Sequence, residues 1–229
     1  MKKYFNYFYV FVSKCIYRLV YCLMAYTPVF KLYQPIYGQK TLKDSTRQCE
    51  DRWRVFSKHL PAGRGAILDV GCNIGYFSFQ LAEQGNFVYG LEADDFYALA
   101  GKAIKDRNKI DNVVFIKQYI DHDFVKNLPS FDVIVNLSVF HHWVKVYGLE
   151  QATDMMRLMA NKCSCMVFET GQSNEAGSQW PEILAFMGDD PKKWIEAFLK
   201  DIGFTDVMMV GTFETGLTNV DRYMFVAKK

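Results

Sequence analysis

The stretch ILDVGCNIGYFS, residues 67–78, decides the expected fold. It begins as a short apolar strand, passes through a loop that contains Gly71 and Gly75, and continues into a helical spacing of apolar residues. Glycines at such a strand-to-helix turn allow a ligand to approach the backbone closely. The spacing is neither GxGxxG nor GxxxxGK(S/T), so neither a dinucleotide nor a triphosphate is indicated.

Outward from this motif, apolar strands alternate with helical stretches. Strands are predicted at 66–72, 87–93, 113–118, 131–138 and 165–170, with two more in the C-terminal tail, and helices at 75–85, 95–108, 149–161 and 191–203. This alternation is typical of an α/β fold with an open, mainly parallel sheet and helices on both faces. Glu92 ends the second strand, where a carboxylate can accept hydrogen bonds from ribose hydroxyls. The loop and this carboxylate together predict a nucleoside-containing cofactor across the strand ends.

Composition and charge set the broad class. The 229 residues are enough for one domain with a full core, and 50% of them are hydrophobic. Of the 27 basic and 25 acidic side chains, residues 1–43 carry seven basic and no acidic ones, which leaves 44–229 with a net charge of −5. An acidic main domain disfavours a nucleic-acid partner. Six dispersed cysteines, none in a CxxC pair, indicate reduced thiols in a cytoplasmic protein and no metal site.

Residues 4–30 form the most hydrophobic stretch of the chain and lack a signal peptide's cleavage motif. Lys14 and Arg18 interrupt this stretch and disfavour a membrane-crossing helix, because each would cost about 2.5–3.5 kcal/mol at the bilayer centre. On a helical wheel, apolar side chains gather opposite basic and polar ones: Phe5, Phe8, Val12, Ile16, Leu19 and Leu23 against Lys3, Asn6, Ser13, Lys14 and Arg18. We therefore expect residues 1–43 to be an extension with a helix on the cytoplasmic membrane surface, ahead of a domain at 44–229. The alternative is a helix that covers the core or docks on another subunit.

Three stretches resemble the signature strands of class I S-adenosylmethionine (SAM)-dependent methyltransferases. They are ILDVGCNIGYFS, GLEAD (90–94) and FDVIVNLS (131–138). The resemblance covers roughly residues 64–229. It implies a Rossmann-like fold with a seven-stranded sheet, SAM as cofactor and S-adenosylhomocysteine as product. Upstream of the core, the family uses a lid in which Tyr33 and Arg52 would contact the methionine end. We expect a lid helix over STRQCEDRW (45–53), with Asp44 or Ser45 as its N-cap. The cofactor-binding set that the resemblance implies is Tyr33, Arg52, Asp69, Gly71, Cys72, Asn73, Gly75, Tyr76, Phe77, Glu92, Ala93, Tyr119, Ile120, Asn136, Leu137 and Ser138.

A narrower resemblance rests on LSVFHHWVKVYG (137–148). This stretch is similar to the methyltransferase domain of the bifunctional kinase–methyltransferases that cap bacterial O-antigen chains, and YQPIYG (33–38), RQCEDR (47–52), DDPKKWI (189–195) and RYMFVA (222–227) match in the same order. In those proteins a kinase adds a terminal phosphate, which is then methylated. The resemblance implies O-methyl transfer to a glycan or glycolipid, with the terminal phosphate as one candidate for the methylated group. No kinase domain lies within these residues, so we expect a separate kinase or glycosyltransferase partner.

His141 and His142 follow the strand that would end beside the donor methyl group, so we expect at least one of them to contact the acceptor as a catalytic residue. On an extended strand adjacent side chains point in different directions, so only one histidine would touch the substrate. A hydroxyl acceptor requires a base with a pKa near neutrality, whereas an ionised phosphate requires cations. The expected substrate-binding cations are Arg47, Lys145 and Arg222.

Two other functions stay open at this stage. One is methylation of a small molecule or of an RNA terminal phosphate. The other is a SAM-binding protein without catalysis, which would act as a membrane partner of a glycan-synthesis enzyme. Bound cofactor without turnover would identify the latter.

Overall fold

The computed structural model describes residues 2–26, 32–39, 45–47 and 49–229, with the side chains of the first helix described from Val12 onward. One sheet contains seven strands in the order β3-β2-β1-β4-β5-β7-β6. These are β1 (Ala66–Val70), β2 (Phe87–Glu92), β3 (Val113–Lys117), β4 (Phe131–Leu137), β5 (Cys163–Glu169), β6 (Asp206–Phe213) and β7 (Arg222–Lys228). Strands β1 to β5 pair in parallel, and β7 is antiparallel to both β5 and β6. The predicted mainly parallel sheet is confirmed.

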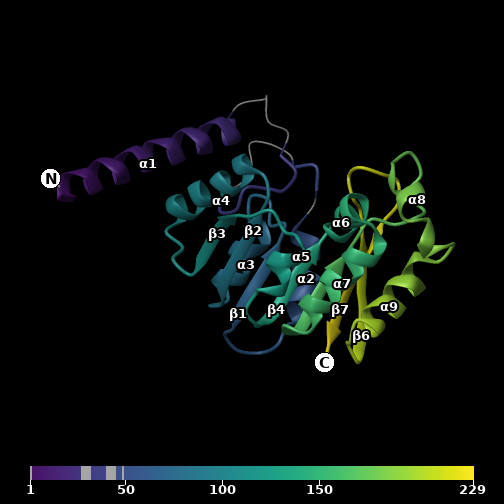
Figure 1. The fold of residues 1–229 in the computed structure, drawn as a ribbon. Helices are drawn as coiled ribbons and strands as arrows, with labels where there is room; N and C mark the ends of the chain where they lie inside the picture. The colour runs from purple at the N-terminus through teal and green to yellow at the C-terminus, as the bar shows by residue number, and fades with distance from the viewer. Residues whose placement is uncertain (1, 27–31, 40–44, 48) are drawn as a thin grey trace.

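Helices cover both faces of the sheet, as predicted (Figure 1). On one face lie α2 (Glu50–Phe56), α3 (Tyr76–Glu83) and α4 (Asp95–Asn108), with α1 (Lys2–Tyr26) outside α4. On the other face lie α5 (His122–Lys126), α6 (Phe140–Tyr147), α7 (Leu149–Ala160), α8 (Trp180–Ile183) and α9 (Pro191–Asp201). Successive strand residues serve opposite faces: Leu68 belongs to one apolar cluster and Ile67 to the other. Burial on both faces explains why the central strands read as continuous apolar runs.

Helix α1 lies against α4 and extends beyond it (Figure 1). Its inner side is buried at Val20, Tyr21, Met24 and Ala25. The Tyr21 hydroxyl donates to Gln39 Oε1 at 2.7 Å, and the Arg107 guanidinium lies 4.5 Å from the Tyr21 ring centroid. This side of α1 therefore covers the domain. In the described part of the chain, no helix combines the length and apolarity that crossing a bilayer requires. The side chains of Lys3, Phe5, Asn6 and Phe8, which the helical wheel includes, lie outside the described residues.

Two local predictions are wrong. The histidine pair does not lie on an extended strand, because β4 ends at Leu137 and the chain turns at Ser138, whose φ is 62°. Phe140, Trp143 and Val144 then recur at helical spacing and are buried, which makes α6 amphipathic.

The predicted lid helix also begins later than expected, at Glu50. The Ser45 hydroxyl donates to the backbone oxygen of Arg47 at 2.9 Å, so Ser45 stabilises a turn instead of capping a helix. The other proposed cap, Asp44, lies outside the described residues.

Candidate active site

The motif loop and the end of β2 form one side of the candidate site. Gly71 has a φ of 65°, and a Cβ there would lie 2.6 Å from Val139 Cγ2. The Glu92 carboxylate accepts hydrogen bonds from the backbone nitrogens of Asn73 at 2.8 Å and Asp94 at 2.9 Å. Each carboxylate oxygen keeps a further lone pair, so Glu92 can fix the loop and still accept a hydrogen bond from a ligand.

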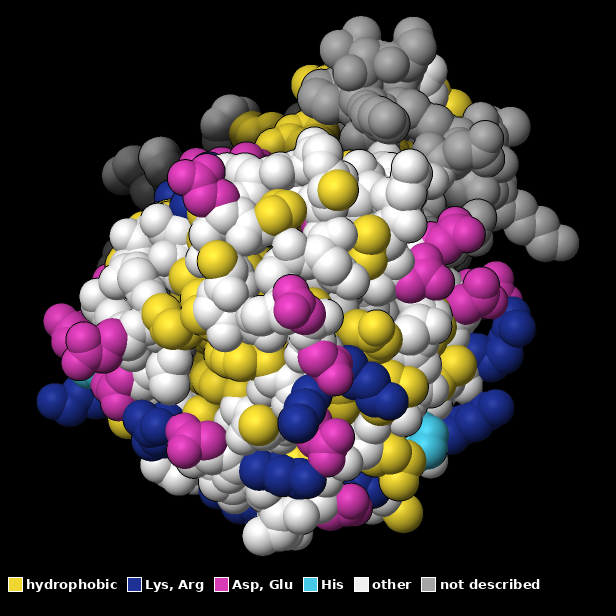
Figure 2. Space-filling view, turned by 90° about the vertical axis from the view of Figure 1, so that its right-hand side faces the viewer, with side chains coloured by type: hydrophobic (Ala, Val, Ile, Leu, Met, Phe, Trp, Pro, Cys, Tyr) yellow, Lys and Arg dark blue, Asp and Glu magenta, His cyan; other side chains and the backbone are white. Residues whose placement is uncertain are grey.

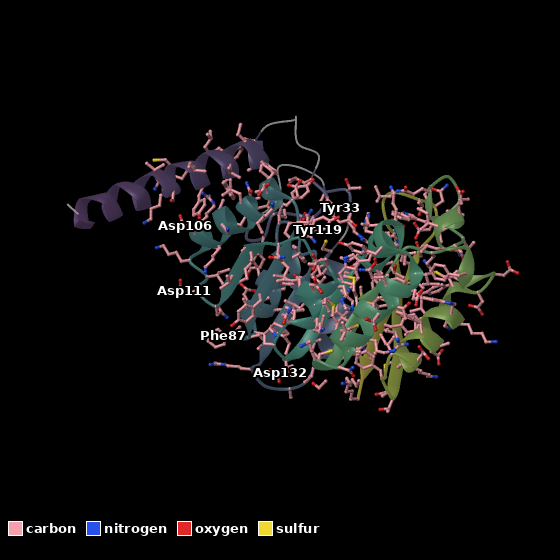
Figure 3. The ribbon with its side chains drawn as sticks, in the orientation of Figure 1. Tyr33, Phe87, Asp106, Asp111, Tyr119 and Asp132 are labelled. Carbon is pink, nitrogen blue, oxygen red and sulfur yellow. The ribbon has the colours of Figure 1, made fainter. Side chains whose placement is uncertain are left out.

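A cavity of about 290 Å³ opens beside this loop, at the carboxyl ends of β1, β2 and β4. Its lining includes Gly71, Glu92, Ala93, Tyr119, Ile120 and Ser138 of the predicted cofactor set, and His142. Sequence analysis missed six other lining residues, namely Leu91, Gln118, Val139, Trp143, Val146 and Tyr147. Tyr33 and Tyr119 lie at this end of the molecule, whereas Asp132 lies at the opposite end (Figure 3).

The rest of the predicted loop and strand residues lie outside this lining: Asp69, Cys72, Asn73, Gly75, Tyr76, Phe77, Asn136 and Leu137. Tyr76 and Phe77 are the first two residues of α3 and are buried in the apolar cluster between this helix and the sheet. Asp69 accepts a hydrogen bond from Ser78 at 2.5 Å, and burial raises the pKa of Asp69 to about 7 despite that bond. Among the described residues, the buried Oδ1 atoms of Asn73 and Asn136 have no hydrogen-bond partner. Such buried acceptors favour a ligand donor nearby.

Glu169, at the end of β5, joins two arginines that precede β1. Its side chain is fully buried between Arg47 and Arg52, whose side chains are 5% and 2% exposed. Arg47 pairs with Glu169 Oε1, while Arg52 Nε lies 3.0 Å from Oε2 and Arg52 also donates to the backbone oxygen of Glu214. Burial alone would raise the pKa of Glu169, but Arg47 and Arg52 outweigh it and lower that pKa. The two predicted lid arginines therefore fasten the upstream segment to the sheet.

Ser138 connects this pair to a third arginine. Its hydroxyl accepts from Arg47 at 2.6 Å and Arg222 at 3.1 Å and donates to Glu169 at 2.9 Å. Arg222 also forms a bidentate pair with the buried Glu175, at 2.7 and 2.8 Å. Together with Arg52, the buried cluster holds three guanidinium groups and two carboxylates, so one positive charge is in excess. Within the described residues, Arg47 Nε has no hydrogen-bond partner.

The two histidines are neighbours on α6 but have different surroundings. His141 is buried, and its Nδ1 accepts a hydrogen bond from the backbone nitrogen of Gly171 at 2.8 Å. Burial lowers the pKa of His141 well below its usual value, and Arg222 adds to the effect. His142 is exposed and lines the cavity; partial burial, Arg222 and Lys145 lower its pKa. Both rings are therefore neutral near pH 7, and His142 is the one at the cavity.

The segment after β5 closes over the histidines. The Trp180 ring meets both imidazoles edge-on, with centroids 4.3 Å from His141 and 5.1 Å from His142. Lys145 Nζ donates to Gln179 Oε1 at 2.7 Å, which ties α6 to the same segment. Lys145 is absent from the described cavity lining, so its contribution there is electrostatic. Glu169, Glu175 and Trp180 are site residues that sequence analysis missed.

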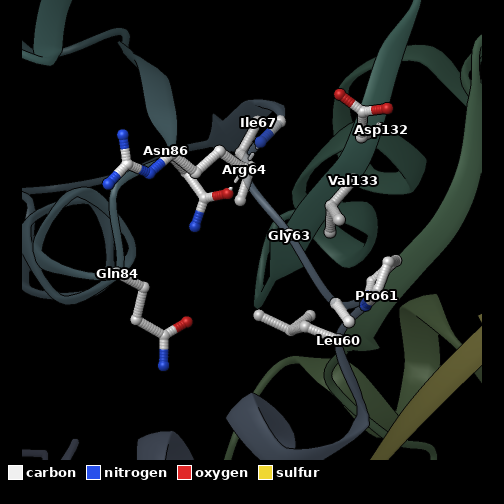
Figure 4. Close-up of a pocket in the computed structure, with 11 residues that line it drawn as sticks. Leu60, Pro61, Gly63, Arg64, Ile67, Gln84, Asn86, Asp132 and Val133 are labelled. Carbon is white, nitrogen blue, oxygen red and sulfur yellow. Dashed lines mark hydrogen bonds between the residues drawn. The ribbon is translucent and has the colours of Figure 1, made fainter.

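A smaller pocket of about 80 Å³ lies near the amino ends of β1 and β4 (Figure 4). Its polar groups hold the chain: Asp132 Oδ2 accepts from Ala66 N at 2.7 Å, and Asn86 Oδ1 accepts from Gly65 N at 3.0 Å. Ligands of open parallel sheets bind outside the carboxyl ends of the strands, which is the opposite end. The cavity at the carboxyl ends of β1, β2 and β4 is therefore the candidate active site.

The matching family model is described as a methyltransferase domain and covers residues 63–186, more than half of the chain. An Escherichia coli O-antigen chain terminator bifunctional methyltransferase/kinase, WbdD, is 26% identical over 210 residues, which are 86% of this chain and 27% of that protein. A tRNA U34 carboxymethyltransferase from Desulfotalea psychrophila is 32% identical over 126 residues, 52% of this chain and 37% of that protein. The chain thus spans about a quarter to two fifths of the length of these relatives.

Solved structures agree on the fold. A WbdD crystal structure matches with a TM-score of 0.78 and 24% identity over 91% of this chain and 46% of that one. The magnesium protoporphyrin IX methyltransferase of Synechocystis PCC 6803, solved with bound SAM, matches with a TM-score of 0.59 and 19% identity over 93% of this chain and 97% of that one.

The residues at the cavity fit SAM as the cofactor. Tyr119 and Tyr147 supply aromatic surface and Ile120 apolar surface for an adenine, next to the Glu92 carboxylate for a ribose. A side chain at Gly71 would collide with Val139, so the backbone at this point is left open for close approach. With this site, the seven-stranded fold and the match over more than half its length, the chain belongs to the methyltransferase domain family, as a class I methyl-transfer enzyme.

Proposed function

We propose that this enzyme transfers a methyl group from SAM to an oxygen of a glycan or glycolipid, and that this oxygen belongs to a terminal phosphate. The observation that supports the phosphate is the buried cluster of Arg47, Arg52, Arg222, Glu169 and Glu175, in which three guanidinium groups meet two carboxylates and which Ser138 links to the cavity. More cations than carboxylates beside a cavity favour an anionic ligand there.

Burial is the main cause of the lowered pKa values of both histidines, and the neighbouring cations lower them further. Arg222 contributes to the depression for both His141 and His142, and Lys145 contributes for His142. Cations that disfavour a proton on an imidazole also attract a phosphate oxygen, which is ionised at neutral pH and needs no base. The field at the cavity therefore suits a phosphate better than a neutral hydroxyl.

The residues near the cavity would then hold the cofactor and the acceptor in place. When bound, SAM supplies an electrophilic methyl group. Glu92 and the motif loop hold the cofactor, and the Ser138 hydroxyl links the arginines to the end of β4. Neutral His142 can donate one hydrogen bond to the acceptor or, for a hydroxyl acceptor, take its proton. Holding donor and acceptor in line supplies much of the rate.

The tRNA-modifying relatives favour a second acceptor class, but the charge distribution does not support it. Residues 44–229 carry a net charge of −5. The face over α8 and α9 mixes acidic and basic side chains, with no continuous basic surface in that view (Figure 2). Nucleic-acid binding requires a basic surface that neutralises phosphates.

We also infer that a kinase or glycosyltransferase works with this enzyme at the cytoplasmic membrane face. WbdD is described as a bifunctional methyltransferase/kinase, and this chain matches 27% of its length. A phosphate acceptor would have to be made by a kinase-type reaction before methyl transfer. The basic, apolar residues 1–43 support the membrane location.

The deciding experiment is transfer of labelled methyl from SAM to glycolipid and polysaccharide fractions, with and without phosphatase treatment beforehand. We expect phosphatase to abolish labelling. Labelling that survives phosphatase would refute the phosphate and indicate a hydroxyl with His142 as base. The matched control is boiled phosphatase, which should leave labelling intact. SAM binding without label transfer to any fraction would favour the non-catalytic role.

A further inference from the structure

Helix α1 has a second apolar side that the described part of the domain leaves partly exposed. Ile16, Leu19 and Tyr26 are 44%, 60% and 57% exposed, and Leu23 is 38% exposed. With Val12, Cys15 and Cys22, these residues recur at intervals of three and four, so they form one stripe along the helix, here called the outer stripe. The stripe lies opposite Val20 and Met24, which pack on α4.

A basic residue adjoins the outer stripe, and acidic residues are missing from the whole segment. Lys14 and Arg18 are both exposed. Arg18 neighbours Cys15 and Cys22 at the edge of the stripe, whereas Lys14 lies across the helix, on the side of Tyr21. Residues 1–43 contain seven basic and no acidic side chains. A second copy of the chain, paired along the stripe, would bring only like charges together. The charge complement must come from an anionic partner surface.

The stripe faces the same side of the molecule as the active site. In Figure 1, α1 lies along the edge toward which β1, β2 and β4 direct their carboxyl ends, and α4 lies beneath it. The side of α1 away from α4 therefore faces outward at that edge. A flat surface against the stripe would therefore lie on the side of the molecule toward which the cavity-lining strands β1, β2 and β4 direct their carboxyl ends.

We propose that the outer stripe docks the enzyme on an anionic membrane, with the stripe in the interface and the active site turned toward the bilayer. Arg18 would lie at the lipid phosphates, and Lys14, across the helix, would still be within the electrostatic reach of that surface. The orientation rests on the proposed function, because it places a lipid-linked acceptor at the cavity. The docking itself does not depend on catalysis. An apolar side next to basic residues is the arrangement of helices that lie in a membrane surface.

The test is co-sedimentation of the full chain with phosphatidylcholine vesicles, with and without phosphatidylglycerol. We expect binding to the mixed vesicles that weakens with salt. Ile16→Gln with Leu19→Gln should reduce partitioning at least about 10-fold, since both side chains lose apolar burial. Lys14→Gln with Arg18→Gln should reduce it about five-fold per charge, on the anionic vesicles alone.

Met208→Gln is the matched control. Met208 is 46% exposed on β6 and pairs with Val226, near the amino-end side of the sheet, so its variant should sediment like the parent chain. All variants should keep the parent's SAM affinity and thermal unfolding, which separates loss of docking from loss of the site. Unchanged sedimentation of the stripe variant would overturn the proposal. So would a dimer in analytical ultracentrifugation that this variant converts to monomer, because the stripe would then bind a second copy.

Discussion

Replacing Glu169 with glutamine tests the buried cluster most directly. The carboxylate is completely buried and accepts from Arg47, Arg52 and Ser138. Glutamine keeps the shape but removes the negative charge, so two buried guanidinium groups lose their counter-charge. Because the pKa of Glu169 is lowered in the fold, its ionised form stabilises the protein above the unfolded pKa. This contribution is lost as the pH falls through the lowered folded pKa.

The expected loss is about 3–5 kcal/mol, the usual cost of leaving one partner of a buried ion pair uncompensated. Glutamine can still accept one hydrogen bond, which places the variant near the lower figure. With a urea m-value of about 3 kcal/mol/M for a chain of this size, the midpoint of unfolding should fall by about 1 M. Circular dichroism in urea at neutral pH measures it, and Glu182→Gln, at an exposed position, is the control with no expected shift.

A double-mutant cycle with Arg52→Gln sharpens the test. If charge balance is the cause, Glu169→Gln with Arg52→Gln should be less destabilised than the sum of the two single variants. A midpoint for Glu169→Gln within error of the parent, or a double variant that equals the sum, would refute the reasoning. The cluster would then contribute packing and not charge compensation.

Three further predictions concern the cavity. Glu92→Ala should weaken SAM binding, measured by calorimetry, roughly 10- to 100-fold, because the loop and the ribose lose a charged acceptor. Asp95→Ala, at an exposed position, is the control and should not change the affinity. Equal affinities of the Glu92→Ala variant and the parent would show that the end of β2 does not bind the cofactor. Gly71→Ala should lower SAM affinity, since its Cβ has no room at a φ of 65°, and unchanged binding would show that the loop does not meet the cofactor. His142→Gln should lower kcat more than SAM affinity, whereas His141→Gln should lower the melting temperature because Nδ1 is a buried acceptor. If His142 is a base, kcat should fall only below pH 6.5, because its pKa is lowered and the neutral form persists to more acidic pH; with a phosphate acceptor no acid limb from His142 should appear.

The fold was accessible from sequence because both faces of the central strands are buried. Runs such as 131–137 are mostly apolar and are separated by stretches with helical spacing, so the strands could be located along the chain with few errors. The errors came at α2 and α6, where the chain changes direction. Ser138 adopts a positive φ, which cannot be predicted from a serine in the sequence. The short helix that follows contains aromatic and β-branched residues, which are typical of strands, so the sequence pattern predicted a continued strand there.

The residues that line the cavity could be predicted only in part. Glycines and Glu92 carry a local signal, since loop geometry and the end of a strand follow from neighbouring residues. Trp143 and Tyr147 line the cavity because α6 presents one side to it, which requires knowing that α6 is a helix. Glu169 carries no local signal, because its partners lie 122 and 117 positions away in the chain.

The buried cluster both holds the upstream segment on the sheet and sets the charge near the cavity, although its residues are far apart in the sequence. Arg47 and Arg52 belong to the segment before the domain, and Glu169 belongs to β5, so one carboxylate holds the upstream segment over the sheet. Ser138 connects the same arginines to the turn between β4 and the histidines. A change that loosens the upstream segment therefore also changes the charge at the acceptor end of the cavity. It follows that mutations in this cluster should alter stability and acceptor turnover together, whereas mutations at Glu92 should alter cofactor affinity alone.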